Sequence, residues 1–142
     1  MVLLVAAIPT IIIFGYQIYH THAQNNSILQ ITTDKKTYQP GQTVAMTIKN
    51  NGNHPLVFSD SLLGLIIQNT KTGQKAGLLG SQVMSELKPN ESKTIQWDQK
   101  DIDGKQVQPG AYNARTSTPA SNYSSSAQPV AAGTTFVIQG NP

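Results

Sequence analysis

Three carboxylates and a glycine in the second half of the chain form a pattern that can bind a cation. Asp98, Asp101 and Asp103 are closely spaced, and Gly104 follows the last of them. A calcium loop of the EF-hand type alternates its oxygen ligands and ends in a bidentate glutamate. Here Lys100 interrupts the series, and no acidic residue follows Gly104. The pattern therefore favours a solvated hairpin tip at Asp103-Gly104, with a cation site as the alternative.

Histidines are the second candidate metal ligands. His20 and His22 stand two residues apart, a spacing that puts both imidazoles on one side of an extended chain. Two imidazoles can begin a copper or zinc site, but a closed site needs more ligands. His54 precedes Pro55, and nothing in the sequence brings it near the other two. We therefore expect exposed histidines, no bound metal and no cofactor.

Residues for catalysis are not organised in this sequence. Glu86 and Glu91 could be an acid and base pair, but they flank a turn and are expected to be solvated. There is no Gly-x-Ser-x-Gly elbow and no glycine-rich phosphate loop that opens a helix. The absence of cysteine excludes disulfides, zinc-thiolate sites and thiol catalysis. We predict that the protein is not an enzyme.

The charge pattern argues against nucleic acid as a partner. The net charge is only +3, and Lys35-Lys36 is the only adjacent basic pair. Nucleic-acid-binding domains usually carry a basic stripe interleaved with aromatic residues, and no such stripe is present.

The elements that must position these residues are short strands. Val44, Met46 and Ile48 alternate with more polar residues, a period of two that is typical of a half-buried strand. Several similar segments separated by turns predict an all-β fold, an immunoglobulin-like antiparallel β-sandwich of about seven strands over residues 28–142. The expected strands are 28–33, 44–49, 56–58, 64–69, 92–97, 111–117 and 133–139.

Six residues are expected to have structural roles in this sandwich. Trp97 and Tyr112 should fill the core, Asp103-Gly104 should form a hairpin turn, and Pro109-Gly110 should begin the next strand. Two segments carry no clear strand signal. Residues 76–82 are ambiguous, and residues 118–132 form a long Ser-, Ala- and Pro-rich stretch.

The N-terminal segment is apolar and carries no charge over residues 1–19. As a helix with a rise of about 1.5 Å per residue it would span roughly 28 Å, close to the hydrocarbon thickness of a bilayer. We therefore predict a transmembrane anchor, followed by a linker over residues 20–27, with lipid as one partner. Pro9, Gly15 and Gln17 could pack against a neighbouring helix.

A cleaved signal peptide is the alternative reading of this segment, with Thr21-His22-Ala23 as an imperfect cleavage site. The absence of Lys and Arg before the apolar run, and the length of that run, favour the anchor.

Two signals disagree on the orientation of the predicted anchor. The lysines at 35 and 36 follow the helix, and the positive-inside rule would keep them in the cytoplasm. The polar composition and the sequons at Asn25, Asn90 and Asn122 favour the outside. We expect a single-pass protein of the cell membrane with its β domain on the extracytoplasmic side.

Two segments resemble known families. The run from Thr33 through Tyr38 and Pro40-Gly41 to Asn50 resembles the opening of extracellular immunoglobulin-like modules. The motifs over residues 87–112, which include Trp97, Asp103-Gly104 and Pro-Gly-Ala-Tyr112, resemble the BsuPI-type intracellular proteinase inhibitor domain. Asn90 stands where that family usually has a turn glycine. The resemblance implies a β-sandwich and, as one possible activity, protease inhibition.

Three functions follow from these observations. The first is a membrane-anchored, non-catalytic domain that binds other membrane or envelope proteins. The second is a single-span accessory subunit of a larger membrane enzyme complex, for which His20 and His22 suggest a copper-dependent oxidase or monooxygenase as host. The third is a BsuPI-type protease inhibitor.

Overall fold

The computed structural model describes residues 27–119 and 129–140, and these residues form an all-β structure. Within the described ranges there are nine strands in three sheets and no helix. No helix in these ranges is long and apolar enough to cross a membrane. The anchor predicted over residues 1–19, with Pro9, Gly15 and Gln17, lies outside the described residues.

The first sheet is antiparallel and has the order β1-β3-β7. Its central strand alternates between the core and the solvent. Val44, Met46 and Ile48 are fully buried, whereas Lys49 is exposed. This is the period of two that the sequence predicts for a strand with one buried face. The bounds are Leu29–Thr33 for β1, Val44–Asn50 for β3 and Ser92–Trp97 for β7.

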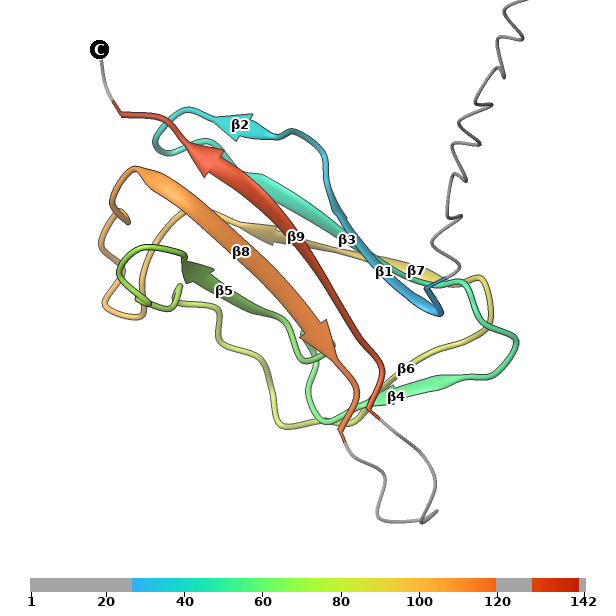
Figure 1. The fold of residues 1–142 in the computed structure, drawn as a ribbon. Coiled ribbons are helices and arrows are strands. Elements are labelled where there is room, and N and C mark those ends of the chain that lie inside the picture. The colour runs from blue at the N-terminus through green and yellow to red at the C-terminus, as the bar shows by residue number, and fades with distance from the viewer. Residues whose placement is uncertain (1–26, 120–128, 141–142) are drawn as a thin grey trace, which may run out of the picture.

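The second sheet has the order β2-β9-β8-β5 and lies against the first, as Figure 1 shows. Its long central pair, β8 and β9, is antiparallel from Gly110 opposite Ile138 to Ser117 opposite Ala131. The bounds are Thr37–Tyr38 for β2, Ile66–Asn69 for β5, Gly110–Ser117 for β8 and Ala131–Ile138 for β9. A separate ribbon pairs β4 (Leu56–Phe58) with β6 (Ser85–Leu87).

The core lies between the two larger sheets and is centred on aromatic rings. Trp97 comes from β7, and its ring centroid lies 6.3 Å from that of Phe136 on β9. Phe136 in turn stacks on Tyr112 of β8 at 5.8 Å and meets the edge of Tyr38 at 5.6 Å. All four side chains are buried. Such contacts between rings add to the free energy gained by burying apolar area.

The chain changes sheets between β1 and β2. Asp34 still belongs to the first sheet, because its N–H donates to the carbonyl of Ala45 at 3.0 Å. Three residues later Thr37 pairs with Val137 in the second sheet. No turn reverses the chain at this crossing, so β2 runs parallel to β9. The sandwich therefore differs from a purely antiparallel one at this pair.

The observed strands agree with the predicted ones in their positions and exceed them in number. The seven predicted strands are all present, with ends shifted by at most two residues. The two additional strands, β2 and β6, have only two and three residues. Strands this short cannot show a reliable period of two, which is why the prediction of about seven strands falls below the nine observed.

Candidate interaction surface

Asp101 stabilises the hairpin by accepting hydrogen bonds from backbone N–H groups within the turn. Asp101 accepts hydrogen bonds on Oδ1 from the N–H groups of Asp103 at 3.0 Å and Lys105 at 2.9 Å. Gly104 has a φ of 75°, which favours glycine at this turn. Asp103 and Gly104 lie in a turn across which Lys100 pairs with Gln106.

The predicted cation ligands do not form a cluster. Asp98 makes an exposed ion pair with Lys100 at 3.2 Å. Within residues 27–119 and 129–140, no group of three His, Asp or Glu side chains is placed to hold a metal. His54 is exposed, while His20 and His22 lie outside the described residues.

The two glutamates that flank the turn at residues 88–91 have different environments. Glu91 accepts the N–H of Lys88 on Oε2 at 2.7 Å and so closes the turn. Glu86 is exposed on β6, where it pairs with Val57 of β4. Asn90 at the turn has a φ of 63°. This left-handed conformation favours glycine and, among other residues, asparagine.

Tyr112 and Gly110, which were predicted to have structural roles, lie at the start of β8. The Tyr112 ring is buried, and its hydroxyl donates to the carbonyl of Gln108, four residues earlier. Gly110 lies against the side chain of Asn69, which would be 3.2 Å from a Cβ at position 110. Its φ of 149° is also one that residues with a Cβ rarely adopt. Pro109 directly precedes this strand.

Gln99 is a buried polar residue that the sequence analysis missed. Its side chain is fully buried, and its φ is 59°. Oε1 accepts the N–H of Gly41 at 2.9 Å and the amide of Gln106 at 3.1 Å, and Nε2 donates to the carbonyl of Gln39 at 3.0 Å. One amide therefore joins three segments at one end of the sandwich. The alternation of Ile95 and Trp97 continues to Gln99 and could have indicated its burial.

A second feature that the sequence analysis missed is a group of exposed apolar side chains. In the segment between β5 and β6, Leu79, Val83 and Met84 are 80%, 62% and 71% exposed. Exposed apolar side chains that form a contiguous patch mark a site of protein or membrane interaction.

Two further exposed apolar residues adjoin that segment. The first is Val57 on β4, which lies opposite Glu86 on β6, the strand that begins directly after Met84. The second is Ile102 in the hairpin that contains Asp101 and Asp103. This hairpin packs closely on Gly77, where a Cβ would overlap the backbone of Asp101 and Ile102. We call the five exposed apolar residues the apolar rim: Val57, Leu79, Val83, Met84 and Ile102.

Comparisons with known proteins identify no family. No family model and no curated protein matches the chain. Among solved structures, it is similar to an alkylpurine DNA glycosylase of Pseudomonas fluorescens bound to DNA, with a TM-score of 0.43 and 11% identity. It is also similar to a β-glucosidase from Erythrobacter marinus, with a TM-score of 0.40 and 16% identity. A PapD-like domain of human CEP192 has a TM-score of 0.33 and 12% identity.

The matches cover 78–80% of this chain but only 31% of the glycosylase and 15% of the glucosidase, against 82% of the PapD-like domain. TM-scores at this level do not establish a shared fold, and they say nothing of function.

Proposed function

We propose that this protein is a membrane-tethered, non-catalytic module that binds another membrane or envelope protein on the extracytoplasmic side. The single observation that carries the proposal is the apolar rim. Its most exposed members, Leu79 and Ile102, are 80% and 72% exposed. Burying large apolar side chains such as these against a partner would contribute about 25 cal/mol for each Å² removed from water.

Within the all-β class, we infer that the fold is an immunoglobulin-like sandwich, and two observations support this inference. The first is the change of sheets between β1 and β2, which gives β2 a parallel pairing with β9. The second is the bond from the Tyr112 hydroxyl to the carbonyl of Gln108. A tyrosine near the start of the penultimate strand that bonds to the backbone upstream is a hallmark of immunoglobulin-like domains.

The proposed membrane tether is inferred from the sequence alone. Residues 1–19 are uncharged and apolar, and the first strand begins at Leu29. A linker of about eight residues then holds the sandwich near the bilayer surface. An anchored module meets membrane partners at a high effective concentration, so that a small apolar surface is enough for stable association.

The experiment that tests the proposal is native gel electrophoresis of gently solubilised source membranes, with mass spectrometry of every band that contains the chain. The proposal predicts co-migration with at least one other envelope or membrane protein. Stoichiometric co-migration with a multi-span enzyme would define the protein as an accessory subunit. Migration at its own mass plus detergent would contradict the proposal, and inhibition of a subtilisin-like protease by the purified protein would favour a BsuPI-type inhibitor instead.

A further inference from the structure

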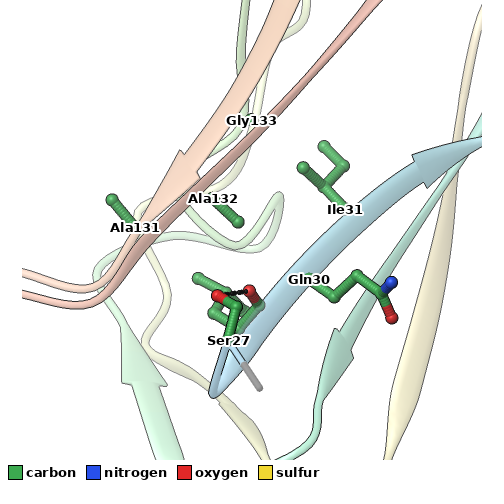
Figure 2. Close-up of a pocket in the computed structure, with 7 residues that line it drawn as sticks. Ser27, Gln30, Ile31, Ala131, Ala132 and Gly133 are labelled. Carbon is green, nitrogen blue, oxygen red and sulfur yellow. Dashed lines mark hydrogen bonds between the residues drawn. The ribbon is translucent and has the colours of Figure 1, made fainter. Parts of the chain in front are cut away.

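A hollow of about 360 Å³ opens between the first and second sheets at one side of the sandwich. Ser27, just before β1, and residues 29–31 of β1 line one side of it, and residues 131–133 of β9 line the other (Figure 2). None of these residues is charged. We call this hollow the seam. Its volume is that of a small ligand pocket.

Among the residues that the structure describes, the backbone of β9 is unpaired along the seam. Only Val137 and Ile138 pair with β2, so β8 is the single described neighbour of residues 131–136 in the sheet. The N–H of Thr118 on the β8 side donates to the carbonyl of Val130, and the N–H of Val137 donates to Lys36 on the other side. Because antiparallel strands alternate their bonding direction, residues 131, 133 and 135 point their N–H and C=O groups away from β8.

Within residues 27–119 and 129–140, the edge of β1 that faces away from β3 is also unpaired. Ile28 accepts the N–H of Asn51, and Asp34 donates to Ala45, so the intervening residues 29, 31 and 33 point their backbone groups away from β3. The hydroxyl of Ser27 donates to the carbonyl of Leu29 at 2.6 Å, so this carbonyl already has a hydrogen-bond partner. Both edge strands therefore offer backbone hydrogen-bonding groups to the same hollow.

The β9 strand itself lacks the charged residues and prolines that usually protect an edge strand. Residues 131–135 read Ala-Ala-Gly-Thr-Thr and carry no charge and no proline. At the other end of the same sheet, the edge of β5 is covered by residues 74–76, because Asn69 donates to Gln74 and Ala76 donates to Ile67. An open and neutral edge of this kind is a template for an added strand.

Lys36 limits how far an added strand can extend. Its carbonyl bonds to Val137, so the position beside β9 is already occupied from there on. Its ammonium lies 3.5 Å from the hydroxyl of Thr134, at the end of the seam. A guest strand that runs parallel to β9, as β2 does, would reach this ammonium with its carboxyl end. A chain that ends there avoids a clash with Lys36 and places its carboxylate beside a positive charge.

We propose that the seam binds the carboxyl-terminal strand of a partner polypeptide, which adds to β9 in parallel and places its terminal carboxylate at Lys36. The small residues at Ala132 and Gly133 leave room for the guest. A second copy of this chain fits less well, because a β9 strand paired antiparallel about Gly133 would bring its residue 130 against the position that Lys36 occupies. This inference goes beyond the proposed function, since a tethered module needs no such site and the seam would bind peptides without the tether.

The test uses the full chain in detergent micelles and two pools of seven-residue peptides randomised at the last four positions. One pool has free carboxyl termini and the other is amidated. We expect enrichment of peptides from the free-acid pool only, with affinity lowered at least tenfold by amidation. Hydrogen exchange at Ala131, Gly133 and Thr135 should slow when the best free-acid peptide binds. Equal capture from both pools, or no capture, would overturn the proposal.

Two variants and one control locate the site. Lys36→Met should weaken peptide binding at least tenfold. Gly133→Pro removes an outward N–H at a position where a side chain has ordinary van der Waals room, and it should abolish the slowed exchange. Lys35→Met is the matched control, because the Lys35 ammonium lies over the Tyr38 ring and Lys35 does not line the seam. Loss of binding in the control and retention in Lys36→Met would overturn the assignment. A dimer of the free protein that Gly133→Pro dissociates would also overturn the assignment. It would show that β9 pairs with β9 of a second copy of this chain.

Discussion

The ring of Trp97 lies 5.8 Å from the ring of Tyr112, and the two come from opposite sheets of the sandwich. The indole Nε1 also donates to the carbonyl of Lys100 at 2.9 Å. One side chain thus joins the two sheets and orients the segment that leads into the aspartate hairpin.

Removal of that ring should be among the most costly single changes in the core. We predict that Trp97→Ala lowers the free energy of unfolding by about 3–5 kcal/mol, because it leaves a cavity between the sheets. Trp97→Phe should cost less, since it keeps an aromatic ring there. Urea unfolding followed by circular dichroism measures both, because Trp97 is the only tryptophan and its fluorescence is lost. A loss below about 1 kcal/mol for the alanine variant would contradict this core.

Gln99 should matter for stability although it is polar. We predict that Gln99→Ala costs about 2–4 kcal/mol, because it leaves the N–H of Gly41 and the carbonyl of Gln39 without their partner. Gln96→Ala, at an exposed position of the preceding strand, is the matched control and should change stability by less than about 0.5 kcal/mol. Equal urea midpoints for the two variants would show that the buried amide contributes little.

The turn at Asn90 offers a test of backbone strain. With a φ of 63°, Asn90→Gly should leave the free energy of unfolding within about 0.5 kcal/mol of the parent or raise it. Asn90→Ala should lower it by about 1 kcal/mol, because a Cβ disfavours the left-handed conformation. Thermal unfolding of the two variants side by side measures the difference. An alanine variant as stable as the glycine variant would mean that the turn relaxes to another conformation.

Stability should fall at high pH through Tyr38. Burial, together with the hydrogen bond from its hydroxyl to Asp34 at 2.7 Å, raises the pKa of Tyr38 to about 12. Since the folded state holds this proton more tightly than the unfolded state, its contribution is complete below about pH 10 and is lost as the pH rises toward 12. The same hydrogen bond lowers the pKa of Asp34, so a smaller loss is expected in acid, below the ordinary carboxyl range.

The comparison variant for this effect is Tyr38→Phe. It keeps the buried ring and removes the titrating group, so its stability between pH 10 and 12 should fall less than that of the parent. Urea unfolding at several pH values gives both curves. Parallel curves over this range would rule out Tyr38 as the cause.

Period-two patterns predicted most of the sandwich. Val44, Met46 and Ile48 alternate strictly, and the strand lies where the pattern put it. Turn residues were equally informative, because Asp103-Gly104 and Pro109-Gly110 have few other roles. These signals are local, and so they can be read without knowing the fold.

The surfaces were not predictable in this way. Leu79, Val83 and Met84 follow no period, so nothing in the sequence indicated whether they were buried or exposed. The free edge of β9 depends on where β1 leaves the first sheet, which is a relation between segments about a hundred residues apart. Gln99 was missed because a polar residue between Asp98 and Lys100 resembles part of a solvated turn.

Site-specific crosslinking tests the binding role most directly. The chain has no cysteine, so Met84→Cys and Ile66→Cys can each carry a single photoactivated crosslinker. Both positions are exposed and apolar, but Ile66 lies on β5, outside the apolar rim. In intact source membranes we predict a discrete protein adduct from position 84 and none from position 66. No adduct from either position, or the same adducts from both, would contradict the account of the apolar rim as a partner surface.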